Sequence, residues 1–114
     1  MVSTSIPGDI QDFLAHYLPG LDYLETFIVL QRNASRLWSA TDVSAELRIP
    51  TATAEQVLER LASDNFLEVK IANELLYRFN PATAALETSA AHCADLYVHE
   101  RIAMISLVTA KDDA

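Results

Sequence analysis

The 114-residue sequence has only one cysteine, only two glycines and no long apolar run. A single thiol, Cys93, excludes a disulfide within the chain, and we expect a reducing, cytoplasmic location. The isolated Gly8 and Gly20 cannot build a glycine-rich phosphate loop, and no nucleophile–base arrangement is visible. We therefore expect a protein that is not an enzyme and needs no cofactor.

Membrane segments are also missing from the pattern. Residues 102–108 are mostly apolar, but a membrane-spanning helix needs roughly 20 such residues. No charged start followed by a long apolar core marks a signal peptide. We expect no contact with a membrane.

Basic side chains are scarce, with 8 Lys and Arg against 16 Asp and Glu, which gives a formal net charge of −8. This charge repels nucleic acid at long range, although it does not exclude a local basic patch. Half of the residues are hydrophobic, which excludes a disordered chain. The length suits one domain over residues 1–114.

Apolar spacing predicts two helices in the first third of the chain. In residues 9–18, apolar side chains recur at steps of three and four, which is one stripe of an amphipathic helix. Residues 21–32 are apolar on more than one side, so we expect the central core helix there. Residues 1–7 should form a loose lead-in, and residues 111–114 a frayed tail.

Two further helices should follow in close succession. Ser39 is a good N-cap and Asp42 lies in the favourable first turn, so a short helix is expected over residues 40–48. Pro50 then ends this helix, because the residue before a proline disfavours the helical conformation. The next helix begins at Thr51, or at Thr53 with a capping box to Gln56.

A hairpin and a long helix complete the expected fold, which is mainly α. Asn65 tolerates a left-handed turn, and residues 66–71 and 75–79 alternate as two short strands. No proline or glycine interrupts residues 82–109, which we interpret as one helix. Its apolar stripe consists of Leu86, Ala90, Cys93, Tyr97, Met104 and Val108.

The long helix indicates a homodimer. About 28 residues at ~1.5 Å each would extend some 40 Å, beyond the small domain that precedes it. A second copy of the chain could cover the apolar stripe, in the two-fold arrangement common to dimers. The alternative is that the stripe packs entirely within one chain.

Residues 21–79 resemble the winged helix-turn-helix superfamily of transcription regulators. The resemblance rests on Trp38-Ser39, on Ile49-Pro50, and on the run from Leu58 to Glu68 that joins the last helix to the hairpin. It implies that the helix over residues 51–64 enters a DNA major groove and that the hairpin, called the wing, touches the DNA backbone. The residues that would then contact DNA are Thr51, Thr53, Gln56, Arg60, Lys70 and Arg78.

The charge of this segment departs from a DNA-binding pattern. The helix over residues 51–64 has three acidic side chains against Arg60, and residues 39–79 have seven acidic against four basic ones. Neutralised phosphates supply most non-specific DNA affinity. A DNA-binding homodimer remains our first interpretation, and a winged helix that binds a protein instead of DNA is the alternative.

Single residues also allow two interpretations. Arg60 and Gln56 could read base edges, or they could be solvated, with Arg60 paired to a neighbouring carboxylate. Trp38 could stack on a ligand, but we expect it in the core.

The C-terminal helix raises two similar choices. His92, Asp95 and His99 share a helix face, but a polar surface is a simpler interpretation than a metal site. Cys93 should be a buried small apolar residue rather than a reactive thiol.

Overall fold

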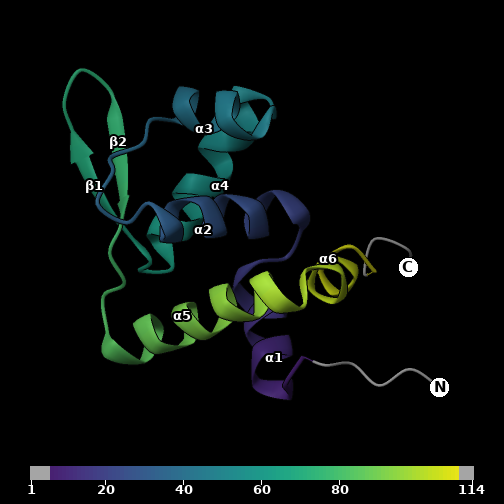
Figure 1. Ribbon diagram of the computed structural model, residues 1–114. Helices are drawn as coiled ribbons and strands as arrows, with labels where there is room; N and C mark the ends of the chain where they lie inside the picture. Colours follow the sequence, from purple (N-terminus) through teal and green to yellow (C-terminus); the bar gives the residue numbers. More distant parts are fainter. Residues whose placement is uncertain (1–5, 111–114) are drawn as a thin grey trace.

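The computed structural model describes residues 6–110, as six helices and one two-stranded antiparallel hairpin (Figure 1). Most of the lead-in and the tail expected at the two ends lie outside these residues. Ile6, however, is buried with 2% of its surface exposed, so the expectation of a loose lead-in over residues 1–7 was wrong for this residue. The elements are α1 (Gly8–Tyr17), α2 (Leu21–Arg32), α3 (Ala40–Leu47), α4 (Thr51–Ser63), β1 (Leu67–Ile71), β2 (Leu75–Phe79), α5 (Ala84–His99) and α6 (Arg101–Ala110).

The core is centred on α2, as its apolar pattern predicted. Phe27 is fully buried, and its ring meets those of Phe13, Phe66 and Phe79 edge-on at centroid distances of 5.9, 5.3 and 5.6 Å. Edge-to-face contacts of this kind add stability beyond area burial. One side chain of α2 thus joins α1, the turn after α4 and the hairpin.

The turn between α3 and α4 follows from local chemistry. Ser39 Oγ accepts from the Asp42 N–H, and an Asp42 oxygen accepts from the Ser39 N–H, both at 3.0 Å, which completes a capping box. Arg48 ends α3 in the left-handed region at φ 58°. Pro50 precedes α4, which begins at Thr51, so the proposed start at Thr53 was wrong.

The hairpin β1–β2 is the wing of this arrangement. Asn65 makes the left-handed turn into it at φ 72°, and Val69 pairs with Tyr77 and Ile71 with Leu75 in its register. Figure 1 shows the wing projecting beside α3 and α4, away from α5. Trp38 forms a β-bridge to Tyr77 and is 1% exposed, so its core placement is confirmed.

The C-terminal segment is two helices, so the single helix expected over residues 82–109 was wrong. The backbone leaves the helical conformation at Glu100, with φ −128° and ψ 41°, and α6 turns across the end of the molecule (Figure 1). Both α5 and α6 pack on α1 and α2. A straight helix would carry Met104 and Val108 away from this body, whereas the break keeps both buried. No helix within residues 6–110 has the length and apolar content of a bilayer span.

Candidate interaction face between the wing and helix α4

The six residues expected to contact DNA do not form one surface. Thr51 is exposed at the first turn of α4, and its hydroxyl donates to Ser44 Oγ at 3.3 Å. Thr53 and Gln56 line a cavity of about 380 Å³ with the α1–α2 turn and with Thr109 of α6. These two residues therefore lie beside the α1–α2 turn and the end of α6 rather than beside the wing.

Arg60 is engaged within the chain. Its Nε donates to Asp64 Oδ2 at 3.0 Å, and its Nη2 donates to the backbone carbonyl of His16 at 3.0 Å. The guanidinium also lies 5.9 Å from the ring centroid of Tyr23. Of the two interpretations of Arg60, the structure supports pairing with a neighbouring carboxylate, and the side chain fastens α4 to the end of α1.

The two basic residues of the wing, Arg78 and Lys70, differ in whether they form an ion pair. Arg78 donates to Glu68 Oε1 at 2.7 Å across the strands, and this hydrogen bond lowers the pKa of the Glu68 carboxyl below its ordinary value. Lys70 is exposed and has no ion-pair partner in the part of the chain that the structure describes. Of the six residues, only Lys70 therefore offers an uncompensated positive charge.

A groove of about 300 Å³ runs between α4 and the wing, and we call it the wing groove. Its lining combines three acidic side chains with apolar and aromatic ones. Burial raises the pKa of the Tyr77 hydroxyl, and the nearby charges of Glu59 and Glu55 raise it further. The groove is lined by Ala40, Thr41, Glu55, Glu59, Glu74, Leu75 and Tyr77.

Residue spacing in the sequence gives information on the two sides of this groove that the net charge does not give. Glu55 and Glu59 are four residues apart, so they lie on one face of α4. Leu75 and Tyr77 alternate on one face of β2. Only the register of the wing and its bridge to Trp38 show that these two faces lie opposite one another.

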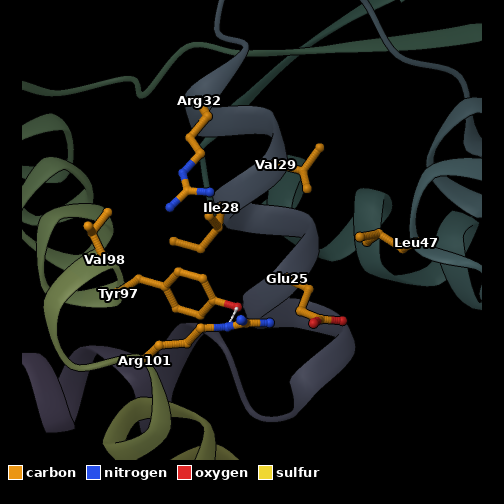
Figure 2. A pocket seen from close by; sticks show the side chains of 8 residues that line it. All are labelled: Glu25, Ile28, Val29, Arg32, Leu47, Tyr97, Val98 and Arg101. Carbon is orange, nitrogen blue, oxygen red and sulfur yellow. Dashed lines mark hydrogen bonds between the residues drawn. The ribbon is translucent and has the colours of Figure 1, made fainter.

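A second cavity, of about 360 Å³, lies between α2, α3 and the α5–α6 junction, and we call it the Tyr97 pocket (Figure 2). Arg32 and Arg101 flank the Tyr97 ring at 5.8 and 5.7 Å from its centroid. Arg101 Nε donates to the Tyr97 hydroxyl at 3.2 Å. Neither arginine has a carboxylate within 4.0 Å among the described residues, and the lining also includes Glu25, Ile28, Val29, Leu47 and Val98.

The stripe expected to face a second subunit is covered by its own chain. Leu86 is partly buried, and the other five side chains are nearly inaccessible to solvent. Burial also raises the pKa of the Cys93 thiol to about 12, which agrees with a buried apolar residue. A dimer through these helices would use their exposed faces instead. The five are Ala90, Cys93, Tyr97, Met104 and Val108.

The polar face of α5 makes only local contacts. His99 Nδ1 lies 3.0 Å from the Asp95 carbonyl and 3.9 Å from its carboxylate, and both side chains are exposed. Within residues 6–110, no three His, Cys, Asp or Glu side chains gather closely enough to hold a metal ion.

Comparisons with solved structures show that the fold is a winged helix-turn-helix. The structure is similar to reduced HlyU from Vibrio cholerae, with a TM-score of 0.58 and 16% identity over 81% of this chain and 90% of that one. It is similar to a mutant MarR from E. coli, with a TM-score of 0.59 and 12% identity over 90% and 72%.

A third similar structure is BpsR from Bordetella bronchiseptica, with a TM-score of 0.51 and 20% identity over 93% and 86% of the two chains. No protein-family profile and no curated sequence matches this chain. At these identities the likeness shows the fold, a winged helix-turn-helix, which by itself does not determine function.

Proposed function

We propose that this chain is a non-catalytic regulatory module that uses the winged-helix scaffold to bind a protein rather than to read DNA. The observation that carries the proposal is the wing groove, because Glu55, Glu59 and Glu74 stand between α4 and the wing. In DNA-reading winged helices these two elements face the duplex. Three carboxylates at that position would meet phosphates with like charge and no counterion to release.

The ion pairing of the basic residues supports the same proposal. Asp64 and Glu68 compensate the positive charges of Arg60 and Arg78, which weakens the attraction of these arginines to phosphate. Lys70 alone of the three has no ion-pair partner within residues 6–110. DNA binding is the competing hypothesis, because BpsR, which has a similar fold, is described as a protein whose DNA binding is regulated.

Selection from a random duplex pool at low salt separates the two hypotheses. We expect the purified full chain to enrich no motif and to bind random duplex negligibly. The triple variant Glu55→Gln, Glu59→Gln, Glu74→Gln should gain measurable salt-dependent duplex binding, because the repelling charges at that face are gone.

A matched control removes the same amount of charge elsewhere. Asp9→Asn, Asp12→Asn and Glu87→Gln change exposed carboxylates on α1 and α5, and this variant should bind duplex as poorly as the unaltered chain. An enriched motif whose affinity falls when Thr51 or Gln56 is replaced by alanine would instead establish DNA reading and refute the protein-binding proposal.

We also propose that the protein acts as a homodimer through the exposed faces of α5 and α6. Val98 and Ile102 are 62% and 80% exposed, and they stand on either side of the α5–α6 junction. Two-fold pairing would cover both from each subunit.

The Tyr97 pocket favours a second role, the binding of a small anionic ligand. BpsR is described as having its DNA binding regulated by 6-hydroxynicotinic acid. Here, two arginines that have no ion-pair partner within residues 6–110 flank an aromatic ring, and the rest of the pocket lining is apolar apart from Glu25. A nicotinate and benzoate series should raise the melting temperature of the full chain. Arg32→Gln with Arg101→Gln should abolish that rise, whereas Arg48→Gln, outside the pocket, should preserve it.

A further inference from the structure

We propose that the wing groove binds a short segment of a partner protein in which basic side chains stand beside large apolar ones. The inference rests on the proposed function, since it names the chemistry of the partner that the module would bind. Two independent features carry it: the exposed apolar face of the wing, which reaches the groove at Leu75, and the unpaired carboxylates that line the groove.

The apolar feature is a strip of side chains that residues 6–110 leave exposed. Leu67, Val69 and Ile71 share one face of the wing with their register partners Phe79, Tyr77 and Leu75. The inner end of this face is core, but Val69, Ile71 and Leu75 are 44%, 83% and 45% exposed.

The strip therefore continues the core outward along the wing, and the wing itself projects from the body of the molecule (Figure 1). Contiguous exposed apolar surface of this kind marks an interaction site in soluble proteins. Large apolar side chains of a partner would cover it.

The acidic feature fixes the charge of the partner. Glu55 and Glu59 on α4 and Glu74 at the wing turn line the groove beside Leu75. None of the three carboxylates forms an ion pair within residues 6–110, and no lining residue is basic. Lys70 lies on the opposite face of the wing, since it alternates with Val69 and Ile71.

Together these features select one class of occupant. A nucleic acid or an anionic membrane surface would be repelled by three uncompensated carboxylates. A neutral apolar segment would leave those carboxylates unpaired at the rim. Lys or Arg within reach of α4, next to Leu-, Ile- or Phe-like side chains on the wing, satisfies both halves of the groove and gives electrostatic complementarity.

A displayed library of random peptides, selected on the immobilised full chain at low salt, tests this inference. We expect the enriched peptides to combine basic with large apolar residues. In amide spectra of the labelled protein, such a peptide should shift Glu55, Glu59, Leu75 and Tyr77. Its affinity should fall by about tenfold in the double variant Glu55→Gln, Glu59→Gln, which removes two charge pairs.

Matched variants separate the groove from diffuse attraction to a chain of net charge −8. Leu75→Ser should weaken peptide binding as the double variant does, whereas Glu87→Gln on α5 and Asp12→Asn on α1, both exposed, should have no effect. Equal losses in these controls, shifts confined to α5, or no basic enrichment would each overturn the groove assignment. Such a result would leave the protein-binding proposal standing, since only an enriched DNA motif refutes that.

Discussion

Trp38 and Tyr77 exchange two backbone hydrogen bonds, from Trp38 N to Tyr77 O at 2.7 Å and from Tyr77 N to Trp38 O at 2.8 Å. The segment ahead of α3 therefore pairs with β2 on the edge that β1 leaves free. Ala40 and Thr41, which line the wing groove, follow closely after Trp38. This pair fixes the wing against the helix-turn-helix and so determines the shape of the groove.

Replacing Trp38 with alanine should destabilise the fold by about 3–5 kcal/mol, as large-to-small core changes do. The indole ring is 1% exposed and the Arg36 guanidinium stacks 3.8 Å from its centroid. Urea unfolding measures the loss, and Trp38→Phe should lose less because a ring remains. An unchanged unfolding midpoint for Trp38→Ala would show that the ring contributes no packing.

Arg60→Met should lower stability by about 1 kcal/mol. The substitution removes a charged hydrogen bond to the His16 carbonyl and a partly exposed ion pair to Asp64. Lys70→Met is the control, since Lys70 has no ion-pair partner within the described part of the chain, and it should change stability by less than about 0.5 kcal/mol. Both values come from chemical denaturation. Equal effects of the two substitutions would contradict a structural role for Arg60.

The parts of the fold that could be predicted are those set by short-range sequence features. The Ser39–Asp42 capping box, the left-handed turn at Asn65 and the two-residue alternation of the wing each depend on neighbours within a few positions. Those signals correctly placed the helix-turn-helix and the hairpin. The residue types alone also showed that α4 carries more acidic than basic side chains.

What could not be predicted depends on contacts between distant segments. Arg60 donates a hydrogen bond to a backbone carbonyl 44 positions earlier. A backbone acceptor of this kind cannot be predicted from any pattern of side chains. The break at Glu100 has no proline or glycine to mark it, and it exists because α6 must turn to bury Met104. The wing groove likewise requires the Trp38–Tyr77 bridge to bring Glu59 near Leu75.

Cys93 should make stability fall at high pH. Burial raises its folded pKa to about 12, from an ordinary value of 9.0, so the folded state favours the neutral thiol. This contribution is fully present below pH about 9 and is lost as pH rises toward about 12, by up to about 1.4 kcal/mol per pH unit. The pKa of Tyr77 is also raised, so the test compares unfolding free energies with Cys93→Ala, whose decline should be shallower. Parallel pH profiles would contradict this assignment.

Association through α5 and α6 should depend on their exposed residues and not on the buried stripe. Light scattering at micromolar concentration should give about twice the 12.6 kDa mass of one chain. Val98→Asp or Ile102→Glu should shift this toward the monomer, because an unpaired charge buried in an interface costs several kcal/mol. A charge at Met104 would instead unfold the chain, since that side chain is fully buried within it.

Ile71→Glu supplies the matched control for the dimer. Ile71 is 83% exposed, much like Ile102 at 80%, but it ends strand β1 of the wing. The wing projects away from α5 (Figure 1). If α5 and α6 form the interface, the Ile71 variant stays dimeric while the Ile102 variant dissociates. Dissociation by Ile71→Glu alone would move the interface to the wing, where a second copy would occupy the groove assigned to a basic partner. A monomer from the unaltered chain would refute the dimer outright.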